Sequence, residues 1–356
     1  MHKPHCISIG ALLCASLCSL SLGGCSNDSS AGVRVSAEDA GPVALRRLTA
    51  EQYERSIHDV LGRHITVPSR LDPDDRREGL LAVGSSFAGI TPSGFEKYEA
   101  AAATIAEQAL DAEHRDDLVP CQPESASAAD DACARAFVEQ VGRRLLRRSP
   151  TGQETEARVQ IAAAAAEALG GFYPGLELAL ASLLVSPDFL FRVEEAETDP
   201  SDPSRSRLTS VSMAPRLSYL LWNTTPDDDL LDAAEAGELV SESGLASQLE
   251  RMLSSPTLDT GLRSIFSDLY DFKQFDDGLV RKDSALFPAY SQPMVEEAKE
   301  QTLRTIVAQL AANGDYRELF TTRESFLTRR LGVVYQVPVP TPSGWEPYLF
   351  SEDAGR

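Results

Sequence analysis

Helical periodicity is the feature that most constrains the fold of this chain. Apolar side chains recur at intervals of three and four residues along most of the sequence, which places them on one face of an α-helix. In the first such segment, Thr49 and Gln52 have the spacing of a capping box, and Gly62 stands where the helix would end. Alternating runs typical of strands are scarce. We therefore expect a mainly α fold of successive helical domains or subdomains, with little or no β-sheet.

The same reasoning places further helices along the chain, with polar segments between them. Residues 68–94 are expected to form a loop, and residues 120–131 and 195–207 to form linkers rich in small and polar residues. Pro215 is expected in the first turn of a helix that starts at Ser212, and Pro226 at the first position of the next helix. Only residues 332–340 look extended, and their prolines favour an edge strand or an arm. The further helices are expected near residues 95–109, 133–148, 154–170, 175–191, 212–222, 226–237, 244–253 and 293–312.

The N-terminus has the pattern of a bacterial lipoprotein signal peptide. A short basic region around Lys3 precedes the apolar run Ile7–Leu22, and Leu22-Gly23-Gly24-Cys25 resembles a lipobox. The run is short for a transmembrane span, although a single uncleaved anchor is the alternative. We expect residues 1–24 to be removed, Cys25 to be lipidated and residues 25–44 to form a flexible tether. Ser26, which follows the cysteine, favours the outer membrane.

Bulk composition limits the classes of partner. The apolar fraction of 42 % is normal for a chain that buries a core, and the net charge is −21. Such a charge repels phosphate backbones, so nucleic acid is not an expected partner. Solubility is the simplest explanation of the acidity. The expected location is the bacterial cell envelope, lipid-anchored, on the periplasmic or surface face of the outer membrane.

Cysteine usage agrees with export. Cys6, Cys14 and Cys18 would leave with the signal peptide, and Cys25 would be acylated. The remaining pair, Cys121 and Cys133, is expected to form a disulfide, because exported proteins reach compartments in which disulfides persist. A metal site is the alternative for this pair, but it would need more ligands, and no histidine lies beside either cysteine.

No catalytic residue can be named from the sequence, and no metal or cofactor site is expected in this portion. The mature chain has only three histidines, which we expect to be exposed or packed: His58, His64 and His114. The chain lacks the Cys-x-x-Cys-His run that attaches haem, a Gly-x-Ser-x-Gly elbow, a Walker loop, a dinucleotide fingerprint and a His-Glu-x-x-His pair.

Several charged runs have both a functional and a simple structural interpretation. Residues 72–78 offer oxygen ligands for calcium, but Arg76 breaks the alternation that an EF-hand loop requires. Glu296 and Glu300 share a helix face and could form a paired-carboxylate site, although a solvated first turn is the simpler interpretation. Residues 227–229 favour a helix start and residues 276–278 a turn. The Arg pairs at 143–144 and 147–148 predict a cationic stripe for internal salt bridges or, as the alternative, for an acidic partner.

Several residue runs resemble a family of large secreted proteins found in planctomycetes and myxobacteria. In that family, domains of unknown function numbered 1587, 1595, 1592, 1588 and 1585 follow in this order. Residues 45–119 resemble the first domain, residues 120–194 the second and residues 207–340 the third. The runs that carry the resemblance are Arg46-Arg47-Leu48-Thr49, Val60-Leu61-Gly62, Cys133-Ala134-Arg135, Gly142-Arg143-Arg144, Ser186-Pro187-Asp188-Phe189-Leu190-Phe191-Arg192, Arg216-Leu217-Ser218-Tyr219-Leu220-Leu221-Trp222-Asn223, Pro226-Asp227-Asp228, Ala236-Gly237, Phe326-Leu327, Arg330-Leu331 and Tyr335.

The C-terminal end of the sequence falls where the resemblance implies that a further domain begins. Residues 341–356 are therefore expected to be the truncated start of the next region, and the alternative is a natural short form.

Two functions from different classes follow from these observations. The first is an envelope lipoprotein that acts as a helical scaffold or interaction module, which the absence of any catalytic motif favours. The alternative is the N-terminal part of an envelope oxidoreductase or polymer-degrading enzyme. The resemblance alone implies that alternative, because family members occur beside c-type cytochrome-like domains, and it makes a c-type cytochrome a possible envelope partner.

Overall fold

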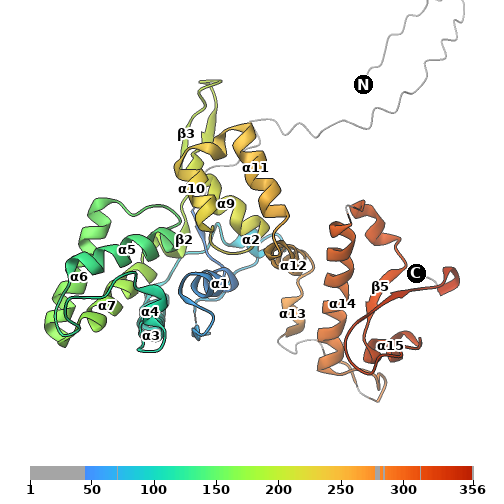
Figure 1. The fold of residues 1–356 in the computed structure, drawn as a ribbon. Helices are drawn as coiled ribbons and strands as arrows, with labels where there is room; N and C mark the ends of the chain where they lie inside the picture. The colour runs from blue at the N-terminus through green and yellow to red at the C-terminus, as the bar shows by residue number, and fades with distance from the viewer. Residues whose placement is uncertain (1–44, 70, 277–280, 284, 313, 355–356) are drawn as a thin grey trace, which may run out of the picture. The chain divides into compact units, whose positions relative to one another are not determined.

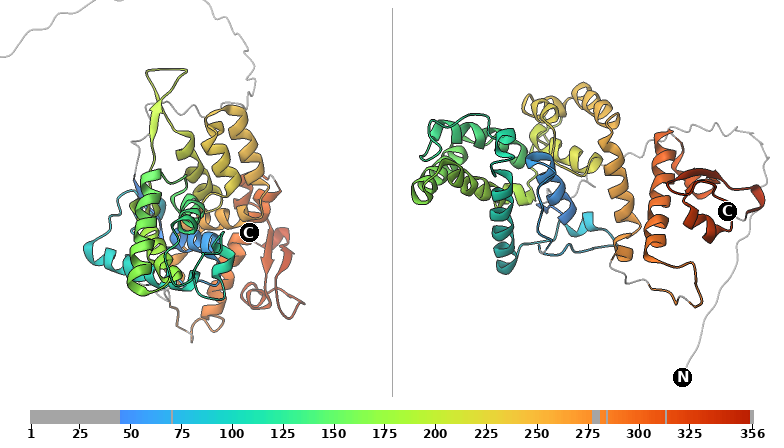
Figure 2. Two further views of the ribbon diagram at one scale, coloured as in Figure 1. Left: turned by 60° about the vertical axis from the view of Figure 1, so that its left-hand side comes forward. Right: turned by 60° about the horizontal axis from the view of Figure 1, so that its bottom comes forward.

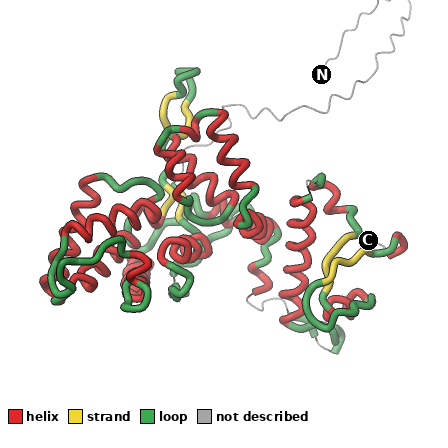
Figure 3. The backbone as a smooth tube through the Cα atoms, in the orientation of Figure 1, coloured by secondary structure: helices red, strands yellow, loops and turns green. Residues whose placement is uncertain are grey.

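A computed structural model describes residues 45–69, 71–276, 281–283, 285–312 and 314–354. They belong to one compact unit that spans Pro42–Arg356. Figures 1 and 3 show that helices dominate: the described residues contain fifteen α-helices and three small two-stranded sheets, so the mainly α prediction is confirmed. The predicted signal peptide, Cys25 and the whole of the predicted tether lie outside the described residues.

The first helices follow the caps that the sequence predicts. Thr49 caps α1 through the predicted box: its hydroxyl accepts from the Gln52 amide at 3.2 Å, and the Gln52 side chain accepts from the Thr49 amide at 3.3 Å. Gly62 ends the helix with a φ of 115°, a value that favours glycine. The predicted loop at 68–94 contains one short helix, and the helix after it starts at Pro92. The helices of this part are α1 (Ala50–Leu61), α2 (Leu81–Gly84), α3 (Pro92–Ala109) and α4 (Arg115–Leu118).

The next part is a helical hairpin with α5 packed against it. α6 and α7 lie side by side in both views of Figure 2, and Gly175 permits their close approach because a Cβ there would lie 2.4 Å from the Ala162 carbonyl oxygen. The helix predicted to reach Phe191 ends at Leu184, because Pro187 disfavours helical geometry at Ser186. The helices are α5 (Asp131–Leu146), α6 (Gly152–Leu169), α7 (Phe172–Leu184) and α8 (Pro187–Leu190).

The largest hydrophobic core joins these two parts. It contains Tyr53 of α1, Ile105 of α3, Phe137 of α5 and Leu180 of α7, and it also reaches Tyr219 of the following part. The first two predicted domains therefore share one core. Burial of this apolar surface is the main favourable contribution to their folding.

The last part contains three smaller cores. They centre on Leu230, on Ile306 and on Leu331, respectively. Its helices are α9 (Ser210–Leu221), α10 (Asp228–Glu235), α11 (Glu242–Leu253), α12 (Thr257–Leu269), α13 (Lys273–Asp276), α14 (Gln292–Ala311) and α15 (Arg329–Tyr335), with 3-10 turns at Glu238–Val240, Tyr316–Phe320 and Glu352–Ala354.

Two predicted helix starts in this part are wrong. α9 begins at Ser210, because the Thr209 hydroxyl caps it by accepting from the Ser212 amide, and Pro215 therefore lies inside the helix. α10 begins at Asp228, two residues after Pro226, because the Asp227 carboxylate accepts from the Leu230 amide at 3.0 Å. In both cases a side-chain cap decides the start and the proline does not.

The prediction of an extended segment at 332–340 is also wrong for its first residues, which are helical. Thr328 caps α15, which continues to Tyr335 and ends at Gln336 with a φ of 57°. The apolar spacing of this short run fits a helix turn as well as a strand. The strands lie elsewhere and pair as β1 (Arg46–Arg47) with β2 (Phe191–Arg192), β3 (Ala196–Thr198) with β4 (Ser206–Leu208), and β5 (Glu324–Leu327) with β6 (Glu346–Leu349), all antiparallel.

Candidate functional site

A cavity of about 640 Å³ lies where α1, the β1–β2 pair, α9 and α12 come together. All three predicted domains contribute to its wall. The first gives the start of α1 and the residues around α2, the second gives β2, and the third gives α9, α12 and parts of α13 and α14. The wall includes Arg46, Glu51, Asp74, Arg76, Leu81, Ala82, Arg192, Glu194, Arg216, Tyr219, Leu220, Asn223, Ile265, Asp268, Phe272, Asp276 and Lys299.

Hydrogen bonds between distant segments hold the wall of this cavity. The Tyr219 hydroxyl lies 2.8 Å from the Ser56 hydroxyl and accepts from Arg147 at 3.1 Å. Asn223 accepts from the Gln52 amide group at 3.0 Å. Since α1 supplies Ser56 and Gln52, while Tyr219 and Asn223 lie on or beside α9, these bonds fix the two helices against each other.

Asp268 of α12 holds the opposite side of the wall. Its carboxylate accepts from Arg76 at 2.8 Å and from the backbone amides of Leu81 at 2.9 Å and Ala82 at 3.1 Å. These two amides open α2, so the carboxylate satisfies N–H groups that the helix itself leaves free. The short helix is therefore fixed to α12.

Arg46 and Arg192 give the cavity its electrostatic character. They face each other across the β1–β2 pair, where Arg46 is the register partner of Arg192. Directly opposite residues of an antiparallel pair project from the same face, so two cations stand side by side. Burial is the largest cause that lowers the pKa of the Arg192 guanidinium to about 10, and repulsion from Arg46 acts in the same direction. The Arg192 side chain therefore stays charged at neutral pH.

Sequence reasoning missed this site. Arg46 and Arg192 both belong to runs that carry the family resemblance, but no spacing in the sequence reveals that the two positions pair. A strand of only two residues has no detectable alternation. The pairing therefore becomes visible only in the folded chain.

The histidines meet in a second pocket of about 260 Å³. The rings of His64 and His114 stack at 3.6 Å, and His58 Nε2 lies 3.0 Å from the Ile65 carbonyl oxygen. Parallel stacked rings direct their nitrogen atoms past each other and not toward a common point. Within the described part of the chain, no group of three His, Cys, Asp or Glu side chains is arranged to hold a metal ion.

The acidic runs are engaged in local contacts. In the calcium-like run, Asp72 binds Lys97, and Asp74 accepts from the Ala50 amide and pairs with Arg47. Glu296 pairs with Lys299, whereas Glu300 pairs with Arg263 at 2.7 Å. Glu296 and Glu300 thus bind different cations and do not form a carboxylate pair. Residues 277–278 of the third acidic run lie outside the described residues.

The arginines of the predicted cationic stripe have two different roles. Arg143 pairs with Glu235 at 2.9 Å and Arg148 pairs with Glu154 at 2.8 Å, which confirms internal salt bridges for those two. Arg147 instead ends α5 with a φ of 61° and is buried. A continuous stripe is therefore wrong, because the helix ends between the two arginine pairs.

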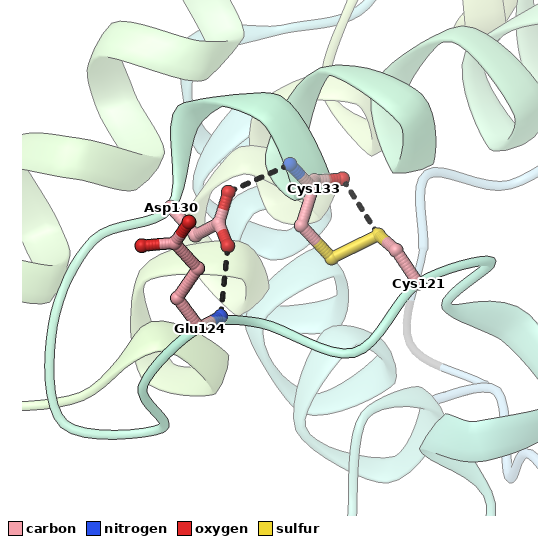
Figure 4. The surroundings of a disulfide bond; sticks show 4 residues. All are labelled: Cys121, Glu124, Asp130 and Cys133. Atoms are coloured by element: carbon pink, nitrogen blue, oxygen red, sulfur yellow. Dashed lines mark hydrogen bonds between the residues drawn. A yellow bond between two sulfur atoms is a disulfide. The ribbon is translucent and has the colours of Figure 1, made fainter.

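Cys121 and Cys133 form the predicted disulfide (Figure 4). Asp130 caps α5 beside it, and its carboxylate accepts from the Cys133 amide at 2.9 Å and from the Glu124 amide at 3.0 Å. The cap and the disulfide together fix the polar linker to the start of the helix.

Comparison with protein families identifies three segments. Residues 46–111 match the model described as a protein of unknown function (DUF1587). Residues 133–194 match DUF1595 and residues 208–337 match DUF1592, with the same description. The chain carries these three domains, in this order. Comparisons with curated proteins and with solved structures gave no match.

With these names, the cavity lies where DUF1587, DUF1595 and DUF1592 meet. Arg46 belongs to the first domain, Arg192 to the second, and Tyr219 and Asp268 to the third. Within the described residues, every helix is too short or too polar to cross a membrane.

Proposed function

We propose that this protein is a lipid-anchored interaction module of the bacterial cell envelope, whose three helical domains bind a ligand in their shared cavity. The observation that carries the proposal is the composition of the cavity wall, to which all three domains contribute. A cavity of about 640 Å³ with both apolar and charged residues in its wall has the size and the mixed lining of a small-molecule site.

The sequence supports the anchor. Leu22-Gly23-Gly24-Cys25 has the form of a lipobox after an apolar run, and Ser26 favours the outer membrane. A lipid on Cys25 would place the helical body at the membrane surface, with residues 26–44 as the connection. The membrane is thus the first proposed partner.

Replacing the anchor cysteine tests the location. We would express the full chain and its Cys25→Ala variant in a Gram-negative host, label with radioactive palmitate and fractionate the envelope. The native chain should carry the label and sediment with the outer membrane, whereas the variant should remain unlabelled and unprocessed. If the native chain instead remains unlabelled and uncleaved, and is retained in the membrane to the same extent as the variant, the result favours an uncleaved anchor and contradicts lipidation.

Filling the cavity tests the binding role. Ala82 is exposed and lies in the cavity wall, so Ala82→Trp should narrow the cavity without disturbing the core. Ala164→Trp, at an exposed position of α6, is the matched control. We would purify the three full chains in detergent from the native host and analyse co-purifying small molecules by mass spectrometry. A compound retained by the native chain and by the control, but lost from Ala82→Trp, supports the role. The same result for all three proteins contradicts it.

A further inference from the structure

The charge balance of the cavity wall is uneven. The wall contains five carboxylates among the described residues, and each has a donor or a cation as its partner. Glu51 pairs with Arg55, Glu194 with Arg216 and Asp276 with Lys299. Asp74 pairs with Arg47 and Asp268 with Arg76. Each carboxylate of the wall thus already has a cationic partner, and Glu194 in addition attracts the Arg192 guanidinium without forming an ion pair with it.

Arg46 and Arg192 are left without such a partner. Neither makes an ion pair or a side-chain hydrogen bond with any residue that the structure describes, and the Nε atom of each is buried without an acceptor. Arg144 and Arg158 also have a buried Nε, but their Nη atoms donate to the carbonyl oxygens of Asp59 and Glu154, respectively, at 3.1 Å. A buried Nε donor without an acceptor is costly. The other N–H donors of these two half-buried guanidinium groups can bind oxygen atoms of water or of a ligand.

Arg147 shows what a structural arginine looks like in the same neighbourhood. Its guanidinium lies 5.8 Å from the centre of the Tyr219 ring and donates to the Tyr219 hydroxyl and to backbone carbonyl oxygens, among them Phe191 at 2.8 Å. Arg192 lies 5.3 Å from the same ring, but it makes none of these bonds. The Tyr219 ring therefore orients the Arg192 guanidinium, and the N–H donors of Arg192 remain available for a ligand.

We propose that Arg46 and Arg192 form a binding site for an oxyanion group, and that the ligand of the cavity is a small organic anion. Planar guanidinium groups bind carboxylate and phosphate oxygens through paired hydrogen bonds. The apolar part of the wall, formed by Leu81, Leu220, Ile265 and Phe272, would contact the body of such a molecule. This inference rests on the binding role proposed for the cavity and names the chemical class of its ligand.

Matched probes test the inference. Benzoate and benzamide have the same shape, but only benzoate carries a charge, and phenyl phosphate presents the other oxyanion. We would measure their binding to the full chain in detergent by titration calorimetry at constant ionic strength, for the native chain, Arg46→Gln and Arg192→Gln. Arg63→Gln is the control, because it removes one positive charge from an exposed side chain that is not part of the cavity wall.

The native chain and the control should bind benzoate or phenyl phosphate at least roughly tenfold more tightly than benzamide. Arg46→Gln and Arg192→Gln should lose this preference. Without ligand, both variants should unfold at the same temperature as the native chain or at a higher one, because the substitution removes repulsion between two cations. That result also shows that they fold. The ratio of benzoate to phenyl phosphate affinity identifies which oxyanion fits.

The outcomes separate this inference from the binding role. Equal affinity for benzamide and benzoate, abolished by Ala82→Trp, would leave the cavity as a binding site and overturn its selectivity for anions. Anion binding that persists in both glutamine variants would overturn the assignment to Arg46 and Arg192. Binding of none of the probes by the native chain would overturn the inference, whereas the binding role itself is decided by the co-purification experiment.

Discussion

Arg147 donates a hydrogen bond to the hydroxyl of Tyr219 at 3.1 Å, although 72 positions separate the two residues. The Ser56 hydroxyl lies 2.8 Å from the same oxygen atom. Ser56, Arg147 and Tyr219 belong to DUF1587, DUF1595 and DUF1592, respectively, so one buried hydroxyl connects the three domains. Polar groups in such a network depend on one another, because a donor or acceptor that loses its partner inside the protein has no water to replace it.

Tyr219→Phe should therefore destabilise the whole unit. The substitution leaves the ring in place but deprives Arg147 and Ser56 of a buried partner. We expect a loss of about 1–3 kcal/mol in the free energy of unfolding. Urea unfolding of the full chain in detergent, followed by circular dichroism, measures it. Tyr53→Phe is the control, because the Tyr53 hydroxyl is buried without a partner and its removal should leave stability unchanged or raise it. Equal losses for both variants would contradict the role given to the network.

Local signals in the sequence predicted much of the fold. The capping box of Thr49 and Gln52 is a contact within four residues, and the structure contains both of its hydrogen bonds. Amphipathic spacing located the long helices for the same reason, because it reports one face of one element. Where two local signals competed, the sequence was less decisive. Pro215 was expected near a helix start, but Thr209 caps the helix earlier.

The candidate site depends on long-range pairing, which such signals do not contain. Arg46 and Arg192 come together because two-residue strands pair between the first two domains. Tyr219 contributes to the largest hydrophobic core and also lies in the cavity wall. A single sequence cannot distinguish these roles, because a buried tyrosine has the same helical spacing in both.

Gly261 allows α12 to approach α9 closely. A Cβ at this position would lie 1.9 Å from the Leu221 carbonyl oxygen and 2.8 Å from the Trp222 amide nitrogen. Both atoms belong to the backbone and cannot rotate away. Gly261→Ala should therefore cost about 2 kcal/mol or more. Gly152→Ala is the matched control, because a Cβ there meets nothing within 4 Å and should be neutral or slightly stabilising. Thermal unfolding of both full-length variants measures the difference; equal midpoints would show that the helices can separate.

The disulfide between Cys121 and Cys133 should stabilise the linker before α5. The sequence separation is 12 residues, and closing a loop of this size restricts the unfolded chain by about 3 kcal/mol. The double variant Cys121→Ser/Cys133→Ser should lose a stability of this order. A reducing agent should lower the melting temperature of the native chain to the same value and leave that of the variant unchanged. Sensitivity of the double variant to the reducing agent would contradict this assignment.

Glu154 should make stability fall at acid pH. Arg148 donates to both of its carboxylate oxygens at 2.8 Å, and the Thr151 amide donates at 2.8 Å as well. These hydrogen bonds lower the pKa of Glu154 from 4.5 to about 2, and the hydrogen bonds from Arg148 are the largest cause. As the pH falls, the unfolded chain therefore takes up the proton before the folded chain does. The contribution is complete above pH 4.5 and is lost as the pH falls toward 2.

Comparison of two neighbouring variants isolates this effect. Glu154→Gln should lower the free energy of unfolding by about 1–2 kcal/mol at neutral pH. This figure includes the weakening of the ion pair by solvent. The stability of the variant should then depend less on pH between 4.5 and 2 than that of the native chain. Glu156→Gln, on the same helix, removes a more exposed partner of Arg135. The hydrogen bond from Arg135 also lowers the pKa of Glu156, but solvent screens this pair more strongly, so the substitution should change the pH profile less than Glu154→Gln does. Urea midpoints from pH 7 to pH 2 measure the profiles. Parallel profiles for Glu154→Gln and the native chain would show that another carboxylate is responsible for the acid sensitivity, because only a group whose pKa differs between the folded and unfolded states produces a slope.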